Sequence, residues 1–325
     1  MTITRRRFTA MAGALALPCA GAQAQTAAST VKLLVGFPAG GVVDVVARAL
    51  ADQLRQQTGT TVVVENRPGA AGKLAIDALL AAPAQGETLA VIPASVLALT
   101  PLVVKSATYD AVRDLSALGS LAEYGFGFAV GPGAPGVSTL QGYKAWALAN
   151  PKSSSYASPG LGTPQHFMGA QLAKLLGIEL THIPYKGGAA AVTDVIGGQV
   201  PLLITTEQLL PPHEAQGKLK TLFVSSRTRN PKMPQVPTAA ELGLGQLESM
   251  DWFGLFARAG TPPAKVAEWR GIVAKVLADP KYAEAIRGMG YGVPAAQPAD
   301  FTKLLTDERA AWTARVRLTG FTAAD

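Results

Sequence analysis

The sequence predicts an α/β protein whose two lobes are joined by two crossover strands and enclose a ligand cleft. Short apolar runs alternate with segments of helical periodicity, which is typical of α/β domains. Without its leader the chain still has about 300 residues, too many for one typical hydrophobic core. A glycine-rich stretch at 125–136, and a strand leading into prolines at 231–237, mark the expected crossings.

The N-terminus has the features of an export signal at residues 1–24. Residues 4–8 form a basic region in the twin-arginine style, residues 10–17 are apolar, and an Ala-x-Ala cleavage site ends at Ala24. The apolar run is far short of the roughly 20 residues that span a bilayer. We therefore expect cleavage after Ala24 and a periplasmic location. Cleavage would also remove Cys19, so disulfides are not expected in the mature protein.

The charge of the chain favours a small anionic partner. The formal net charge of +7 falls to +4 when the three arginines of the leader are removed, because the leader holds no acid. Such a mild positive field suits an anionic solute. No block of Lys and Arg is interleaved with aromatic residues, so nucleic acid is not an expected partner.

The first lobe is predicted from a β-α-β-α-β run. Strand 31–35 leads into a helix that stops at Gly59, and strand 61–65, helix 74–80 and strand 88–92 follow. The apolar positions of the first helix recur at helical spacing: Val43, Val46, Ala47, Leu50 and Leu54.

The second lobe is predicted to begin at a short apolar strand, 126–130, that glycines flank. It continues through helix 140–149, strand 154–157, helix 165–176, strand 179–183, helix 189–196 and strand 200–204. Strand 219–224 is expected to return the chain to the first lobe, where strand 253–257 and helices 265–277, 281–287 and 300–315 complete it. The lobes would comprise residues 25–125 with 227–325, and residues 126–226.

The first candidate binding loop, residues 37–44, connects a strand to a helix. The first N–H groups of a helix have no partner within it, and aligned peptide dipoles leave partial positive charge there. Gly40 and Gly41 let a ligand approach this backbone, so the loop suits an anion without a charged side chain. Two alternatives stay open: an ordinary turn for the loop, and a capping role for Asp44.

The second candidate loop, residues 158–166, is again a glycine-rich connection from strand to helix. Thr163 suits the N-cap and Pro164 the first helical position. Two helix starts facing each other across a cleft would hold an anion from both sides, with hydroxyls of Ser158 and Thr163 adding hydrogen bonds. His166 lies in the first helical turn, either touching the ligand or sitting beside the cap.

A third connection of the same kind covers residues 182–188. Lys186 would counter a carboxylate or simply face solvent, and His182 on the strand is expected to be structural. Neither an enzyme nor a metal site is indicated, because G-x-S-x-G and H-E-x-x-H are absent and the histidines lack metal-ligand spacing. A periplasmic hydrolase using Ser158 and His166 is the alternative, since catalytic triads assemble from distant positions.

Several motifs occur together in a characteristic order: Phe37-Pro38-Ala39-Gly40-Gly41 with Asp44, Glu65-Asn66-Arg67-Pro68-Gly69-Ala70, Tyr156-Ala157-Ser158 through Gly162-Thr163 to His166, Pro184-Tyr185-Lys186-Gly187, Val236-Pro237-Thr238, and Trp252-Phe253-Gly254-Leu255. With this set the mature chain resembles the Bug-type solute receptors of tripartite tricarboxylate transporters. The resemblance implies a periplasmic-binding-protein fold of type II, a "Venus flytrap" that closes on its ligand.

The resemblance also implies the ligand and the partners. The ligand would be a small carboxylate: a di- or tricarboxylate, an acidic amino acid or an aromatic acid. The partners would be membrane permease subunits or a sensor ectodomain, with the protein itself a monomer and without cofactor or metal. The ligand-binding residues would be Phe37, Ala39, Gly40, Asp44, Ser95, Ser158, Gly162, Thr163, His166 and Thr206.

The chain departs from the family pattern near residue 201. Pro201 stands where the family usually has Asp, and residues 202–207 replace a stretch that commonly carries Phe and Asp or Asn. This stretch would lie at the edge of the cleft and would influence which carboxylate is bound. Glu207 is a candidate acidic partner for the ammonium group of an amino-acid ligand, at a shifted position.

Overall fold

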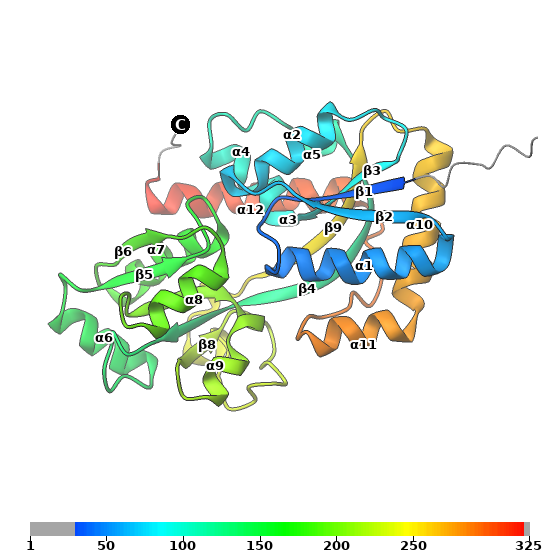
Figure 1. Ribbon diagram of the computed structural model, residues 1–325. Coiled ribbons are helices and arrows are strands. Elements are labelled where there is room, and N and C mark those ends of the chain that lie inside the picture. The colour runs from blue at the N-terminus through cyan, green and yellow to red at the C-terminus, as the bar shows by residue number, and fades with distance from the viewer. Residues whose placement is uncertain (1–29, 322–325) are drawn as a thin grey trace, which may run out of the picture.

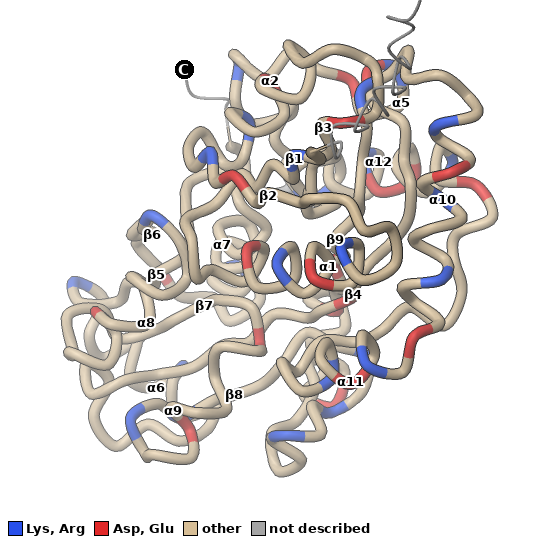
Figure 2. Tube along the Cα trace, turned by 45° about the vertical axis from the view of Figure 1, so that its right-hand side comes forward, with Lys and Arg blue, Asp and Glu red and all other residues tan. Residues whose placement is uncertain are grey.

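The computed structural model describes residues 30–321, so the predicted export signal at 1–24 lies outside the described residues. Within the described range, no helix has both the length and the apolar character needed to cross a membrane. Figure 1 shows two α/β lobes, with strand β4 (Leu115–Val130) running from one lobe into the other. Both signs of charge are spread over the two lobes (Figure 2).

The first lobe is built on the strand order β2-β1-β3-β9-β4. Its strands are β1 (Thr30–Val35), β2 (Thr61–Asn66), β3 (Thr88–Pro93) and β9 (Met250–Arg258). Strand β1 is parallel to β2 and β3, whereas β9 is antiparallel to β3 and β4. The helices are α1 (Val42–Thr58), α2 (Lys73–Ala81), α3 (Ala94–Ala98), α4 (Thr100–Val103), α5 (Ala111–Asp114), α10 (Pro263–Ala278), α11 (Pro280–Gly288) and α12 (Phe301–Thr319).

Helix α1 shows how the apolar spacing of the sequence becomes a packed face. Val46 and Leu50 are fully buried in the main core, as the 3.6-residue period requires. Gly59 ends the helix with a φ of 67°, a left-handed conformation that glycine adopts without steric cost. The buried face fixes the helix against the sheet and therefore fixes where its N-terminus points.

The second lobe continues the sheet through β4-β7-β5-β6, and β8 pairs with β4 beside this path. Its strands are β5 (Ser155–Ser158), β6 (Thr181–Pro184), β7 (Leu202–Thr206) and β8 (Lys220–Val224), and its helices are α6 (Leu140–Ala149), α7 (Pro164–Leu176), α8 (Gly188–Ile196) and α9 (Pro211–Ala215). Four short 3-10 helices complete the described elements. The first, η1 (Ala70–Gly72), precedes α2 in the first lobe, and the others are η2 (Glu207–Leu209), η3 (Ala240–Leu242) and η4 (Gly245–Leu247).

Strand β4 belongs to both lobes. Its first part pairs with β9, from Leu115 opposite Arg258 to Gly125 opposite Met250. Its last part, from Phe126 to Val130, pairs with β7, and from Gly127 on also with β8. The sequence prediction of a strand at 126–130 thus found only the end of a 16-residue strand. Gly127, one of the glycines taken to flank a short strand, lies within β4 at a close packing contact: a Cβ there would lie 2.3 Å from Leu210 Cδ1.

The return crossing also differs from the prediction. Strand β8, expected to carry the chain back, pairs inside the second lobe with the end of β4. Strand β8 is almost wholly buried, so it completes the hydrophobic core of the second lobe and does not connect the two lobes. The chain re-enters the first sheet at Met250, where β9 begins opposite Gly125.

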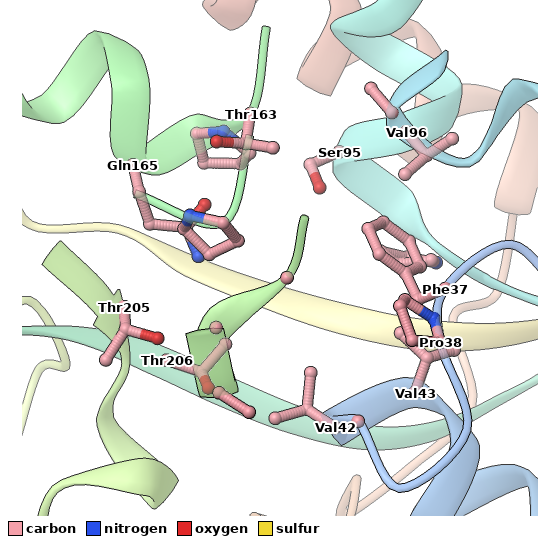
Figure 3. Close-up of a pocket in the computed structure, with 18 of the residues that line it drawn as sticks. Phe37, Pro38, Val42, Val43, Ser95, Val96, Thr163, Gln165, Thr205 and Thr206 are labelled. Carbon is pink, nitrogen blue, oxygen red and sulfur yellow. The ribbon is translucent and has the colours of Figure 1, made fainter. Parts of the chain in front are cut away.

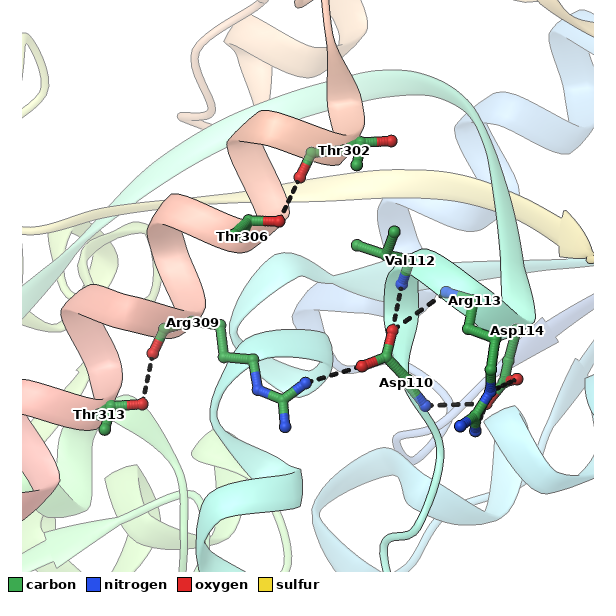
Figure 4. Close-up of polar contacts among 8 residues, drawn as sticks. All are labelled: Asp110, Val112, Arg113, Asp114, Thr302, Thr306, Arg309 and Thr313. Carbon is green, nitrogen blue, oxygen red and sulfur yellow. Dashed lines mark hydrogen bonds and ion pairs between the residues drawn. The ribbon is translucent and has the colours of Figure 1, made fainter.

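The C-terminal helix α12 is fastened to the first lobe by a charged contact. Asp110 caps α5, because its Oδ1 accepts hydrogen bonds from the N–H groups of Val112 and Arg113 (Figure 4). Arg309 Nη1 of α12 donates to Asp110 Oδ2 at 2.8 Å. These backbone donors, led by Arg113, and the Arg309 charge outweigh burial and lower the pKa of Asp110. Farther along, Trp312 packs in one apolar cluster with Leu99 of the first lobe and Phe167 of the second.

Candidate functional site

A cavity of about 190 Å³ lies where loops of the two lobes meet (Figure 3). Its walls are mostly apolar, with Phe37 and Val42 from the first lobe and Leu209 from the second. Among the described residues that line it, Lys186 is the one charged side chain. A largely apolar pocket with a few placed polar groups is the usual form of a small-molecule site.

The N-terminus of α1 reaches the cavity through a loop that Asp44 holds in place. Gly40 has a φ of 75°, and its N–H donates to Asp44 Oδ2 at 2.8 Å. Asn66 Nδ2 donates both to Asp44 Oδ1 and to the carbonyl of Phe37, at 2.9 and 3.0 Å. Arg48 Nε completes the set at 2.8 Å. Asp44 is 1% exposed and does not line the cavity, whereas Val42 and Val43, the first residues of α1, do. The first N–H groups of a helix have no partner within it.

These contacts act on the pKa of Asp44 in opposite directions. Burial acts to raise it, but the hydrogen bonds from Arg48, Gly40 and Asn66 together hold it below 3.8. The carboxylate is therefore ionised and already satisfied. Its geometry is that of a loop anchor and not of a helix cap, because the N-cap of α1 is Gly41 and no side chain caps this helix.

The N-terminus of α7 lines the opposite side of the cavity. Thr163 is the N-cap and Pro164 the first helical residue, as predicted. The Thr163 hydroxyl does not cap the helix but donates to the carbonyl of Gly160 at 2.8 Å. Gly162 has a φ of 76°, and a Cβ there would lie 2.9 Å from Val103 of the first lobe. The loop thus meets the other lobe closely.

Ser158 and His166 form a cluster behind this loop instead of facing the cavity. Ser158 Oγ is fully buried and lies 2.7 Å from His182 Nε2. The His182 ring stacks on His166, with centroids 4.1 Å apart, and the Gly162 N–H donates to His166 Nδ1 at 3.4 Å. Burial lowers the pKa of His166 to about 4 and that of His182, which His166 also repels, to about 3. The two rings are neutral at pH 7 and support the loop.

A third helix N-terminus, that of α8, also lines the cavity. Gly187, with a φ of 104°, precedes it, and Lys186 reaches the same wall. A Cβ on Gly188 would lie 2.9 Å from Thr205 Oγ1, so this helix start can approach β7 only without a side chain. The sequence analysis placed residues 182–188 third among the strand-to-helix connections. The Gly187-Gly188 pair was the sequence signal for this close approach.

The end of β7 contributes two hydroxyls without partners. Thr205 is fully buried and Thr206 is 4% exposed, and neither hydroxyl has a hydrogen-bond partner within the described structure. Both residues line the cavity (Figure 3). By contrast, Glu207, the acidic partner that the sequence suggested for an ammonium group, accepts from Ser226 Oγ at 2.9 Å and does not line the cavity. Buried polar groups are nearly always satisfied, so two orphans at one cavity point to a bound solute that completes them.

A family model described as the tripartite tricarboxylate transporter family receptor matches residues 46–320. The chain belongs to this family. It is 36% identical over 291 residues to a UPF0065 protein in the gbd 5' region of Cupriavidus necator, covering 87% of this chain and 88% of that one. It is 31% identical over 294 residues to Protein BugT of Bordetella pertussis, covering 90% of each.

Solved structures of similar proteins agree with this assignment. Periplasmic binding protein BugD is 29% identical with a TM-score of 0.84, over 91% of this chain and 99% of that one. An R. palustris protein solved with adipate is 27% identical with a TM-score of 0.85, over 91% and 98%. MatC from Rhodopseudomonas palustris with bound malate is 27% identical with a TM-score of 0.79, over 88% and 98%. The predicted receptor fold is confirmed, and these relatives are substrate-binding receptors, not enzymes.

The cavity of this Bug-type receptor gathers most of the residues expected from the sequence. Those that line it are Phe37, Ala39, Gly40, Ser95, Gly162, Thr163 and Thr206. Asp44, Ser158 and His166 do not line it but hold the two loops from behind. Sequence reasoning missed Thr205, whose hydroxyl could not be placed before the register of β7 was known.

Thr206→Val in this receptor is expected to act oppositely on stability and on binding. Removing an unsatisfied buried hydroxyl leaves the ligand-free protein as stable or slightly more stable. Losing one hydrogen bond to the solute weakens carboxylate binding by about tenfold. Urea unfolding and titration calorimetry measure the two effects, and Thr206→Ser, which keeps the hydroxyl, is the matched control. Unchanged affinity in Thr206→Val would exclude this hydroxyl from the site.

Proposed function

We propose that the protein is a periplasmic receptor that binds a small carboxylate through the N-termini of α1, α7 and α8. The observation that carries the proposal is their convergence on one cavity that also holds the orphan hydroxyls of Thr205 and Thr206. Helix N-termini offer free N–H donors and partial positive charge, which together bind a carboxylate. Two similar structures were solved with adipate and with malate, which supports a carboxylate ligand here.

The two-lobed arrangement supports binding by closure. We start from the lobes predicted after cleavage of the leader at Ala24, residues 25–125 with 227–325 and residues 126–226. We move the return boundary from residue 227 to Met250, where β9 begins, because Met233 and Val236 pack in the core of the second lobe. The lobes would move by bending β4 near Gly125 and Gly127, where it passes between the sheets. As a monomer, the closed receptor would deliver its solute to membrane permease subunits or to a sensor ectodomain.

A thermal-shift screen of the mature protein tests the proposal. The panel holds mono-, di- and tricarboxylates, acidic amino acids and aromatic acids, with the corresponding amides as uncharged controls. A solute that binds only the folded state must raise the melting temperature as its concentration rises. We expect at least one carboxylate to do so while its amide does not. No shift with any carboxylate, or an equal shift with the amides, would contradict the proposal.

A further inference from the structure

The C-terminal helix α12 belongs to the first lobe but reaches the second. Within its own lobe, Glu308 Oε1 accepts a hydrogen bond from Trp252 Nε1 of β9 at 2.7 Å. The last turns of the helix lie beside α7 of the second lobe (Figure 1). There Arg315 Nη1 donates to the hydroxyl of Ser249 at 3.0 Å, directly before β9 begins. The helix therefore crosses the boundary between the lobes.

An apolar seam joins the end of α12 to the second lobe beside the cavity. Phe167 of α7 is 2% exposed, although it belongs to a cluster whose other buried members all come from the first lobe: Ala98, Leu99, Val103, Trp312 and Val316. We call these six residues the inter-lobe seam. Separation of the lobes would expose Phe167 to water, which disfavours it.

Phe321 follows α12 and extends the inter-lobe seam to a binding loop. Its ring packs edge-on against Phe167 and against His166, with centroids 5.3 Å apart in both pairs. Edge-to-face pairs of this kind are favourable beyond the area that they bury. His166 Nδ1 accepts from the N–H of Gly162, a residue that lines the cavity. A side chain from the end of the chain thus contacts the support of the loop at 158–166.

The contacts of Phe321 serve the junction between the lobes more than the core of either one. Its two ring contacts in the described structure are both with α7, and the side chain is only half-buried. Because α7 moves with the second lobe while α12 is held to the first, these contacts can persist only while the lobes stay together.

We propose that Phe321 is a positioning residue that holds α7 against the first lobe, so that the lobes rest closed and the loop at 158–166 is in place before a solute arrives. Phe321 does not line the cavity, so it would act on the solute only through the loop and the opening of the lobes. The inference rests on the proposed closure of the receptor, but not on the identity of the solute.

Phe321→Ala tests this role by amide hydrogen exchange on the mature protein without any solute. Loss of a half-buried aromatic contact should raise the population of the open form about tenfold. Exchange should therefore become about tenfold faster on both sides of the inter-lobe seam, at residues 98–104 and at residues 158–168. A loop that merely loosens would exchange faster at 158–168 alone.

Three further variants separate the junction from general stability. Phe321→Tyr keeps the ring and should restore slow exchange on both sides. Val316→Ala shortens a side chain of the same seam and should speed exchange on both sides by a smaller factor. Phe301→Ala is the matched control: it is the same truncation at the other end of α12, where the ring packs against Trp252 within the first lobe at 5.9 Å. Exchange at the seam should not change in this variant.

The results distinguish this inference from the proposed function. If neither Phe321→Ala nor Val316→Ala speeds exchange on both sides of the inter-lobe seam, or if Phe301→Ala speeds it equally, the inference is wrong while carboxylate binding stands. If no carboxylate shifts the melting temperature in the thermal-shift screen, the proposed function is wrong, whatever the exchange rates show.

Discussion

Gly40→Asp is expected to abolish carboxylate binding, whereas Gly40→Asn should keep most of it. Gly40 lines the cavity at the start of α1, and no atom lies within 4 Å of the position that a Cβ would take. Two like charges about 4 Å apart repel by roughly 4 kcal/mol at an effective dielectric constant near 20. That energy corresponds to a loss of about three orders of magnitude in affinity.

The asparagine variant isolates the charge from the backbone. Both Asp and Asn tolerate the φ of 75° at this position better than other side chains, and their sizes are nearly equal. Calorimetry with the best solute of the thermal-shift screen gives the two affinities. Equal losses in the two variants would mean that shape, and not charge, decides binding at this loop.

Asp44→Ala should destabilise the protein and loosen the first binding loop. The substitution leaves the Gly40 N–H and the Asn66 amide without their buried acceptor, and removes the partner of Arg48. Losing such a set costs roughly 2–4 kcal/mol in the free energy of unfolding. Urea unfolding measures this loss. Asp52→Ala, which removes an exposed partner of Arg55 on the same helix, is the control and should change stability little.

The contribution of Asp44 should also depend on pH in a defined direction. Because the pKa in the folded protein lies below its unfolded value of 3.8, folding favours the ionised carboxylate. Its stabilisation is therefore fully present above that value and is lost as the pH falls through the folded pKa. The difference in unfolding free energy between wild type and Asp44→Ala should narrow below about pH 4. A constant difference down to pH 2 would contradict this assignment.

Local patterns of the sequence predicted the lobes and the two facing loops. Gly40 and Gly41 before an apolar period, and Thr163 before Pro164, are signals carried by neighbouring residues, and the helices start where these signals place them. The contacts behind the loops could not be read in this way. Asn66 reaches Asp44 across 22 positions, because β1 and β2 are parallel neighbours.

The remaining differences between the predicted and the observed site come from the pairing register of the strands. Ser158 is turned toward His182 because β5 and β6 run side by side, with Tyr156 opposite His182. No property of the single sequence fixes that pairing.

Strand β4 has a consequence for how the receptor sets its affinity. A continuous hydrogen-bonded strand resists sliding and stretching but yields to twist and bend, so the linkage between lobes is a flexure and not a loose pivot. In the proposed closure, bending of β4 would store elastic energy gradually. The angle between the lobes without ligand would then depend on side chains packed around Gly125 and Gly127, such as Leu210 and Ser226. Residues that never touch the solute would therefore tune its retention and its release.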